Sequence, residues 1–176
     1  MITTYGKPTL PISCMQDFHS RTETDSFMRY NDSIKNQYVF APMSWVGVVP
    51  ETNLYTSDRY LVPLSFNFSC YEDHSLDLTL WIGNFPDQDE RKRFVEAIKT
   101  ADTGGKLNMR KASDKTTTLY VKNISLKHDN GDTYDLQDYN AVVDKLVEVY
   151  NSPEARSVIS LVDEVVKQFN FAPKRP

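Results

Sequence analysis

The sequence contains few of the residues and motifs that usually mark catalytic or metal sites. Its 176 residues include six glycines, and no Walker-type or dinucleotide-type glycine-rich loop is present. The H-E-x-x-H and G-x-S-x-G motifs are also missing. His19, His74 and His128 are scattered, and no two of them have the i, i+3 or i, i+4 spacing of helical metal ligands. We therefore expect no catalytic residues, no metal and no cofactor. An enzyme with unrecognised carboxylate chemistry is the least favoured alternative.

The cysteines, the net charge and the apolar runs exclude further classes of protein. Cys14 and Cys70 belong to no C-x-x-C pair, so zinc and thioredoxin motifs lack their spacing, and we expect two reduced, partly buried thiols. A net charge of −4 argues against bulk electrostatic coating of duplex DNA. The longest nearly apolar run, 38–50, is too short to span a bilayer, and residues 1–10 do not form a secretory signal. These features predict an intracellular, cytoplasmic protein that does not bind membranes.

Aromatic and β-branched residues in the middle of the chain predict strands. We expect strands over 38–49 (bent at Gly47), 60–70, 76–82, 117–127 (with a bulge near Asn123) and 133–136. The clearest is 76–82, where Leu76, Leu78, Leu80 and Ile82 alternate with Asp77, Thr79 and Trp81. The Asp-Asn-Gly-Asp segment at 129–132 predicts the hairpin turn before the last strand.

Three segments have helical periodicity. Asp87 and Glu90 form a capping box before the apolar face of a helix over 87–102, which explains these acidic residues better than a metal-dependent nuclease site does. Two further helices are expected over 138–150 and 152–169. Ser152 followed by Pro153 is typical of a helix start and separates the two.

This order of elements predicts an α+β fold with a mainly antiparallel sheet of about five strands, one inserted helix and a C-terminal helical hairpin. A five-stranded OB-like barrel also has its helix between the third and fourth strands, so both an open sheet and a barrel remain alternatives. We divide the chain into an N-terminal arm or wrapped loop (1–36), a β-rich core (37–136) and the helical hairpin (137–176). The arm has no clear period, although its apolar residues favour ordering against the body or a partner.

The segment 106–127 departs from the acidic average of the chain. It has six basic residues against the single Asp114, a local charge of +5. If Tyr120 and Lys122 face outward on their strand, and Trp81 on its own, aromatic planes lie among cations, as in single-strand-binding surfaces. We therefore predict non-catalytic binding of single-stranded nucleic acid through Trp81, Lys106, Arg110, Lys111, Lys115, Tyr120, Lys122 and Lys127.

The last helix has an apolar stripe wider than a surface helix requires. Packing on the sheet and on the preceding helix is one explanation. The other is an interface built from Val158, Leu161, Val165 and Phe169, and on that basis we predict a homodimer. A protein-interaction module, an inhibitor or adaptor that uses the N-terminal arm and the C-terminal helices, is thus the alternative function.

Overall fold

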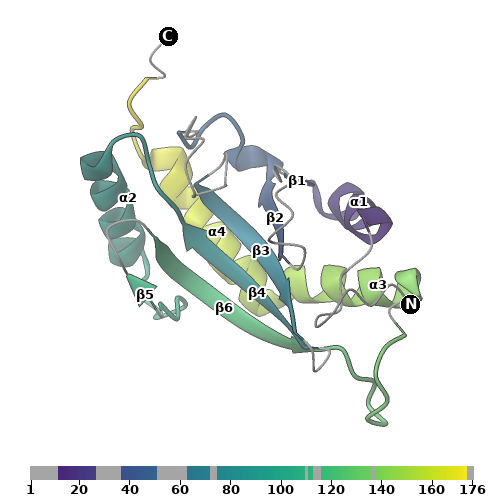
Figure 1. Ribbon diagram of the computed structural model, residues 1–176. Coiled ribbons are helices and arrows are strands. Elements are labelled where there is room, and N and C mark those ends of the chain that lie inside the picture. The colour runs from purple at the N-terminus through teal and green to yellow at the C-terminus, as the bar shows by residue number, and fades with distance from the viewer. Residues whose placement is uncertain are drawn as a thin grey trace.

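The fold is α+β, with helices packed on an open antiparallel sheet. In the computed structural model, residues 12–26, 37–50, 63–71, 75–109, 111–112, 116–135 and 138–173 are described. Four long strands lie side by side in the order β2 (Gln37–Pro42), β3 (Leu64–Cys70), β4 (Ser75–Ile82) and β6 (Thr117–Ser125) (Figure 1). Two short strands, β1 (Thr24–Ser26) and β5 (Lys111–Ala112), flank them at opposite edges. Closure into an OB-like barrel is not seen among the described strands.

The alternation predicted for 76–82 is confirmed in β4. Leu76, Leu78, Leu80 and Ile82 are fully buried, whereas the residues between them are half-buried. Leu80 lies opposite Phe66 of β3 and Tyr120 of β6, so this row of the sheet continues the apolar face across three strands. One face of the sheet therefore forms the main core.

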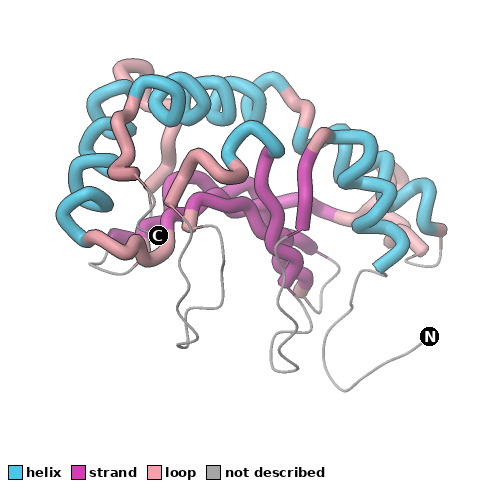
Figure 2. The backbone as a smooth tube through the Cα atoms, turned by 90° about the horizontal axis from the view of Figure 1, so that it is seen from above, coloured by secondary structure: helices cyan, strands magenta, loops and turns pink. Residues whose placement is uncertain are grey.

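The four α-helices of the described residues cover that apolar face and lie on one side of the sheet (Figure 2). They are α1 (Ile12–Thr22), α2 (Gln88–Ala101), α3 (Tyr139–Tyr150) and α4 (Pro153–Gln168). The boundaries predicted for the last three are confirmed to within a residue, because each begins at a side-chain cap. Asp87, Asp138 and Ser152 accept hydrogen bonds from backbone N–H groups of the first turns.

Aromatic rings tie the strands to the helices. Phe40 and Phe66 stack with centroids 5.6 Å apart, and Tyr150 of α3 meets both edge-on. Phe18 of α1 joins the cluster against Phe40 at 5.1 Å. The burial of these rings places α1 and α3 over the β2–β3 half of the sheet.

Two expectations about the first 50 residues are wrong. Part of the predicted arm is an ordered helix, α1, whose buried Cys14, Met15 and Phe18 pack toward α3 and the sheet. This apolar face is too narrow to stand out in the sequence. The strand expected over 38–49 ends at Pro42, which has no N–H to continue a ladder, and is followed by a short 3₁₀ helix, η2 (Met43–Trp45). The Trp45 indole donates a hydrogen bond to Asp163 of α4.

Two details near β6 also differ from the sequence-based prediction. The bulge lies at Leu119, where the register with β4 shifts between Leu80 and Trp81, rather than near Asn123. The turn at 129–132 is confirmed, with Gly131 at a φ of +88°, but the strand expected after it is a single bridge between Lys127 and Thr133. Residues 60–62 and 136 of the expected strands lie outside the described residues.

Candidate binding face of the sheet

The sheet has a second face, opposite the helices, which is mostly polar. We call this the distal face; Val39, Ala41, Ser65, Asn67, Asp77, Thr79, Trp81, Thr118, Val121 and Asn123 lie on it by strand register. No described helix lies on it (Figure 2). Because alternate residues of a strand point to opposite faces, the same pattern that buries the leucines of β4 places Asp77, Thr79 and Trp81 here.

The two halves of the distal face differ in burial. On β2 and β3, Val39, Ala41, Ser65 and Asn67 are all buried. On β4 and β6, by contrast, Trp81 is half-buried and Asn123 is exposed. The accessible part of this face is therefore its β4–β6 half.

Polar contacts order that accessible half. The Asp77 carboxylate accepts hydrogen bonds from Asn123 Nδ2 and from the Tyr71 hydroxyl, each at 2.9 Å. Tyr71 is 40% exposed, so an aromatic ring with an accessible face stands next to the carboxylate. A donor–acceptor surface with aromatic rings suits a polar, planar ligand better than an aliphatic one.

Trp81 is the predicted site residue that the structure places on this face. Its indole lies beside Gly83, where an added Cβ would be 3.5 Å from the ring, and its Nε1 is buried. The register aligns Lys111, Thr118, Trp81 and Ser65 in one row across β5, β6, β4 and β3. Ser65 Oγ is buried and accepts or donates no hydrogen bond within the described part of the chain.

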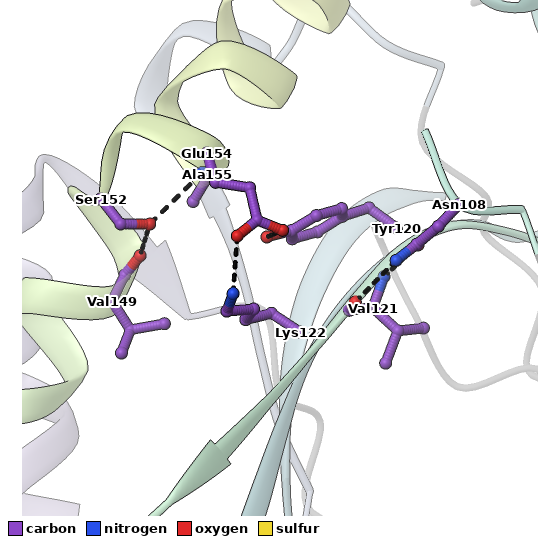
Figure 3. A network of polar contacts seen from close by, with 8 residues as sticks. All are labelled: Asn108, Tyr120, Val121, Lys122, Val149, Ser152, Glu154 and Ala155. Carbon is purple, nitrogen blue, oxygen red and sulfur yellow. Dashed lines mark hydrogen bonds and ion pairs between the residues drawn. The ribbon is translucent and has the colours of Figure 1, made fainter. Parts of the chain in front are cut away.

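Tyr120 and Lys122 are a correction to the predicted surface. They share a face of β6, as expected, but it is the helix-covered face, away from Trp81. Tyr120 is 1% exposed and its hydroxyl donates to Glu154 Oε1 at 3.0 Å, while Lys122 Nζ contacts Glu154 Oε2 at 2.6 Å (Figure 3). A buried ring cannot stack on a base, and the charge of this lysine is compensated within the protein.

Electrostatics around Glu154 agree with a structural role for these contacts. The hydrogen bond from Lys122 is the main cause that holds the pKa of the Glu154 carboxyl below its ordinary value. Burial, followed by the contact with Glu154, raises the pKa of Tyr120 above its ordinary range. The tyrosine therefore stays protonated and donates to the carboxylate, which ties β6 to the first turn of α4.

The other predicted basic residues are spread around β6. Lys106 and Lys127 are exposed, the first after α2 and the second just beyond β6. The backbone of Lys111 is described, but its side chain is not; Arg110 and Lys115 lie outside the described residues. Of the predicted cluster, the described residues thus bring Lys111 into the row of Trp81 and place Tyr120 and Lys122 elsewhere.

The apolar stripe of α4 packs within the chain. Val158 is 1% exposed and Val165 is 7% exposed, so both are covered within the chain, and their role in an interface stays a prediction. Leu161 is half-buried, and Phe169 contacts Phe94 of α2 with centroids 5.1 Å apart.

Sequence reasoning missed two polar side chains that hold the edges of the sheet. Arg91 of α2 is buried, and its guanidinium donates to Gly83 O at 2.7 Å and to Thr117 Oγ1 at 2.9 Å, which joins β4 and β6. Asn108 pairs its amide with the N–H and C=O of Val121 at 2.8 and 2.9 Å, which occupies part of the outer edge of β6. Only the fold brings these distant residues together, so the sequence held no signal for them.

Other chemistry is limited in the described ranges. They contain no group of three or more His, Cys, Asp and Glu side chains placed to hold a metal ion. None of the helices in these ranges is both long enough and apolar enough to cross a membrane. Cys14 is a buried free thiol, and burial, reinforced by Asp17, raises its pKa, which makes it a poor nucleophile.

Comparison with known proteins adds no assignment. No protein-family model matches this sequence, and no curated protein and no solved structure is detectably similar to it.

Proposed function

We propose that this protein is a non-catalytic binding module and that the β4–β6 half of its distal face binds single-stranded nucleic acid. The observation that carries the proposal is the row formed by Lys111, Thr118 and Trp81 on the face where no described helix lies. Stacking of a base on an aromatic ring beside a cation that neutralises phosphate is the usual chemistry of such binding. Lys106 and Lys127 are both exposed and precede and follow β6 in the chain, so they add to the positive charge of this segment.

The residues of the proposed surface differ from those predicted from the sequence. Trp81 and Lys111 are retained as contact residues, Tyr120 and Lys122 are removed, and Arg110 and Lys115 are retained as part of the basic segment. The acidic Asp77 sets one boundary, because a phosphate beside it is disfavoured. An intracellular location forms part of the proposal, in line with the free thiol of Cys14.

Fluorescence titration with a single-stranded oligonucleotide tests this function. In a Trp45→Phe background, Trp81 is the only tryptophan, so its emission reports directly on the distal face. We expect quenching on binding and a log–log salt slope of about −0.7 per phosphate contacted. Trp81→Ala should weaken binding by about 1–3 kcal/mol with little change in slope.

Two controls separate specific contacts from general charge. Lys111→Ala should flatten the salt slope by less than about one unit. Lys99→Ala removes the same charge from α2, on the helix-covered side where Lys99 pairs with Glu96, and should leave the slope unchanged. Unchanged Trp81 emission with both DNA and RNA oligonucleotides at low salt would refute the proposal.

A protein partner is the second candidate, and one exposed loop favours it. Met43 and Val48 are 51% and 46% exposed around the turn at Gly47, which packs beside α4. Contiguous exposed apolar patches mark protein contacts, and this loop supplies two apolar side chains for such a patch. The homodimer stays a proposal: light scattering that gives the monomer mass of 20.3 kDa at every concentration would remove it.

A further inference from the structure

The segment that follows α4 packs against α2 without forming a helix or a strand. Phe169 ends α4 with an extended backbone, and the chain continues through Phe171 and Ala172. Phe169 and Phe171 are half-buried and Ala172 is exposed. We call residues 169–173 the terminal strap.

Aromatic contacts hold the strap against α2. Phe94 is fully buried, and its ring lies 5.1 Å from the rings of both Phe169 and Phe171. Phe171 also contacts Phe85, which precedes α2, at 6.4 Å. The two strap rings lie 4.7 Å apart and thus enter the same apolar surface together.

A main-chain contact completes the arrangement. The backbone N–H of Ala172 donates to the Glu90 carboxylate. Glu90 is 3% exposed, and within the described residues this N–H is the one hydrogen-bond donor to its carboxylate. Proteins bind extended peptides through apolar pockets for alternate side chains together with hydrogen bonds to the peptide main chain. The contacts of the strap provide both.

We propose that Phe85, Glu90 and Phe94 form a binding site for an extended peptide of Phe-x-Phe-Ala type, which the terminal strap occupies in cis. Exchange of the strap for a peptide of the same chemistry keeps the Glu90 carboxylate paired with a backbone N–H, so no buried charge loses its partner. The strap therefore acts as an exchangeable occupant, and the partner is a protein segment of the same chemistry. This site is independent of the distal face and of the proposed nucleic-acid binding.

A labelled peptide with the sequence of residues 167–176 tests the proposal in the full chain. In the wild-type chain, the strap competes at an effective concentration on the order of millimolar, so peptide binding should be weak. Phe171→Ala should release the strap and strengthen binding of the peptide at least tenfold. A peptide that carries the same Phe171→Ala change should bind this variant at least tenfold more weakly than the wild-type peptide does.

A matched pair of charge variants locates the amide contact. In the Phe171→Ala background, Glu90→Gln should weaken binding of the wild-type peptide several-fold, because a charge-assisted hydrogen bond is lost. Glu96→Gln, on the exposed side of the same helix, should change nothing. A folded Phe171→Ala variant that binds no peptide at millimolar concentration would overturn the proposal, as would equal effects of the two glutamate variants.

Amide hydrogen exchange in the wild-type chain provides a test that does not depend on any variant. The N–H of Ala172 should exchange at least tenfold faster than that of buried Ile98, because the strap opens while α2 stays folded. Equal protection of the two amides would mean that the strap leaves only on global unfolding, which refutes an exchangeable occupant.

Discussion

Leu80→Ala probes the packing of the sheet most directly. Leu80 of β4 is 0% exposed and pairs with Phe66 and Tyr120 on the neighbouring strands. Truncation to alanine removes buried carbon atoms and leaves a cavity between rings held by three strands, so we expect a loss of about 2–5 kcal/mol in the free energy of unfolding. Thr79→Ala, one residue away on the distal face, should cost less than about 1 kcal/mol.

Urea unfolding followed by circular dichroism measures the difference. With an m-value of about 2 kcal/mol/M, Leu80→Ala should lower the midpoint by about 1–2.5 M, and Thr79→Ala by less than about 0.5 M. Leu80→Val, a milder truncation, keeps the comparison usable if the alanine variant is too unstable to purify. Equal midpoints for the Leu80 and Thr79 variants would refute the assignment of the two faces.

Three further predictions concern polar contacts and caps. Glu154→Gln should destabilise the protein by at most about 1 kcal/mol at neutral pH, because the carboxylate is half exposed. The folded-state pKa of Glu154 is lowered, so the stability that its carboxylate contributes is present above the unfolded-state pKa and is lost as the pH falls through the folded-state pKa. A difference in unfolding free energy between wild type and variant that grew in acid would contradict this. Tyr120→Phe should cost about 0.5–1.5 kcal/mol for the lost hydrogen bond, whereas Tyr120→Ala should cost about 3–5 kcal/mol; thermal unfolding of both distinguishes a buried ring from an exposed one. Asp87→Ala should cost about 1 kcal/mol through loss of the α2 cap, and Asp87→Asn should restore most of it in the same assay.

Local patterns were the reliable part of the sequence. The alternation of β4, the acidic start of α2 and the Ser152-Pro153 junction each encode their structure within a few residues, because side-chain period and capping are local properties. The structure reproduces all three.

Contacts between distant segments account for the predictions that failed. The three buried residues of α1 have the i, i+1, i+4 spacing of one helical face, but the pattern covers little more than one turn in a mostly polar stretch. This helix is held by its packing on α3 and the aromatic cluster. The strand expected through Trp45 ends at Pro42, and Trp45 instead donates its indole hydrogen to Asp163, more than a hundred residues away. The residues that contact α1 and Trp45 are too distant in the sequence for a local pattern to indicate them.

The candidate site shows the same division. The sequence alone determined that a basic, aromatic segment follows the glycines after α2 and that Trp81 points away from the leucines of its own strand. Which face α4 covers was decided only in the tertiary structure: Glu154 meets Tyr120 and Lys122 across 34 and 32 residues and takes them out of the predicted surface. Strand parity assigns two side chains to the same face, but only packing determines which face meets the helices and which remains accessible.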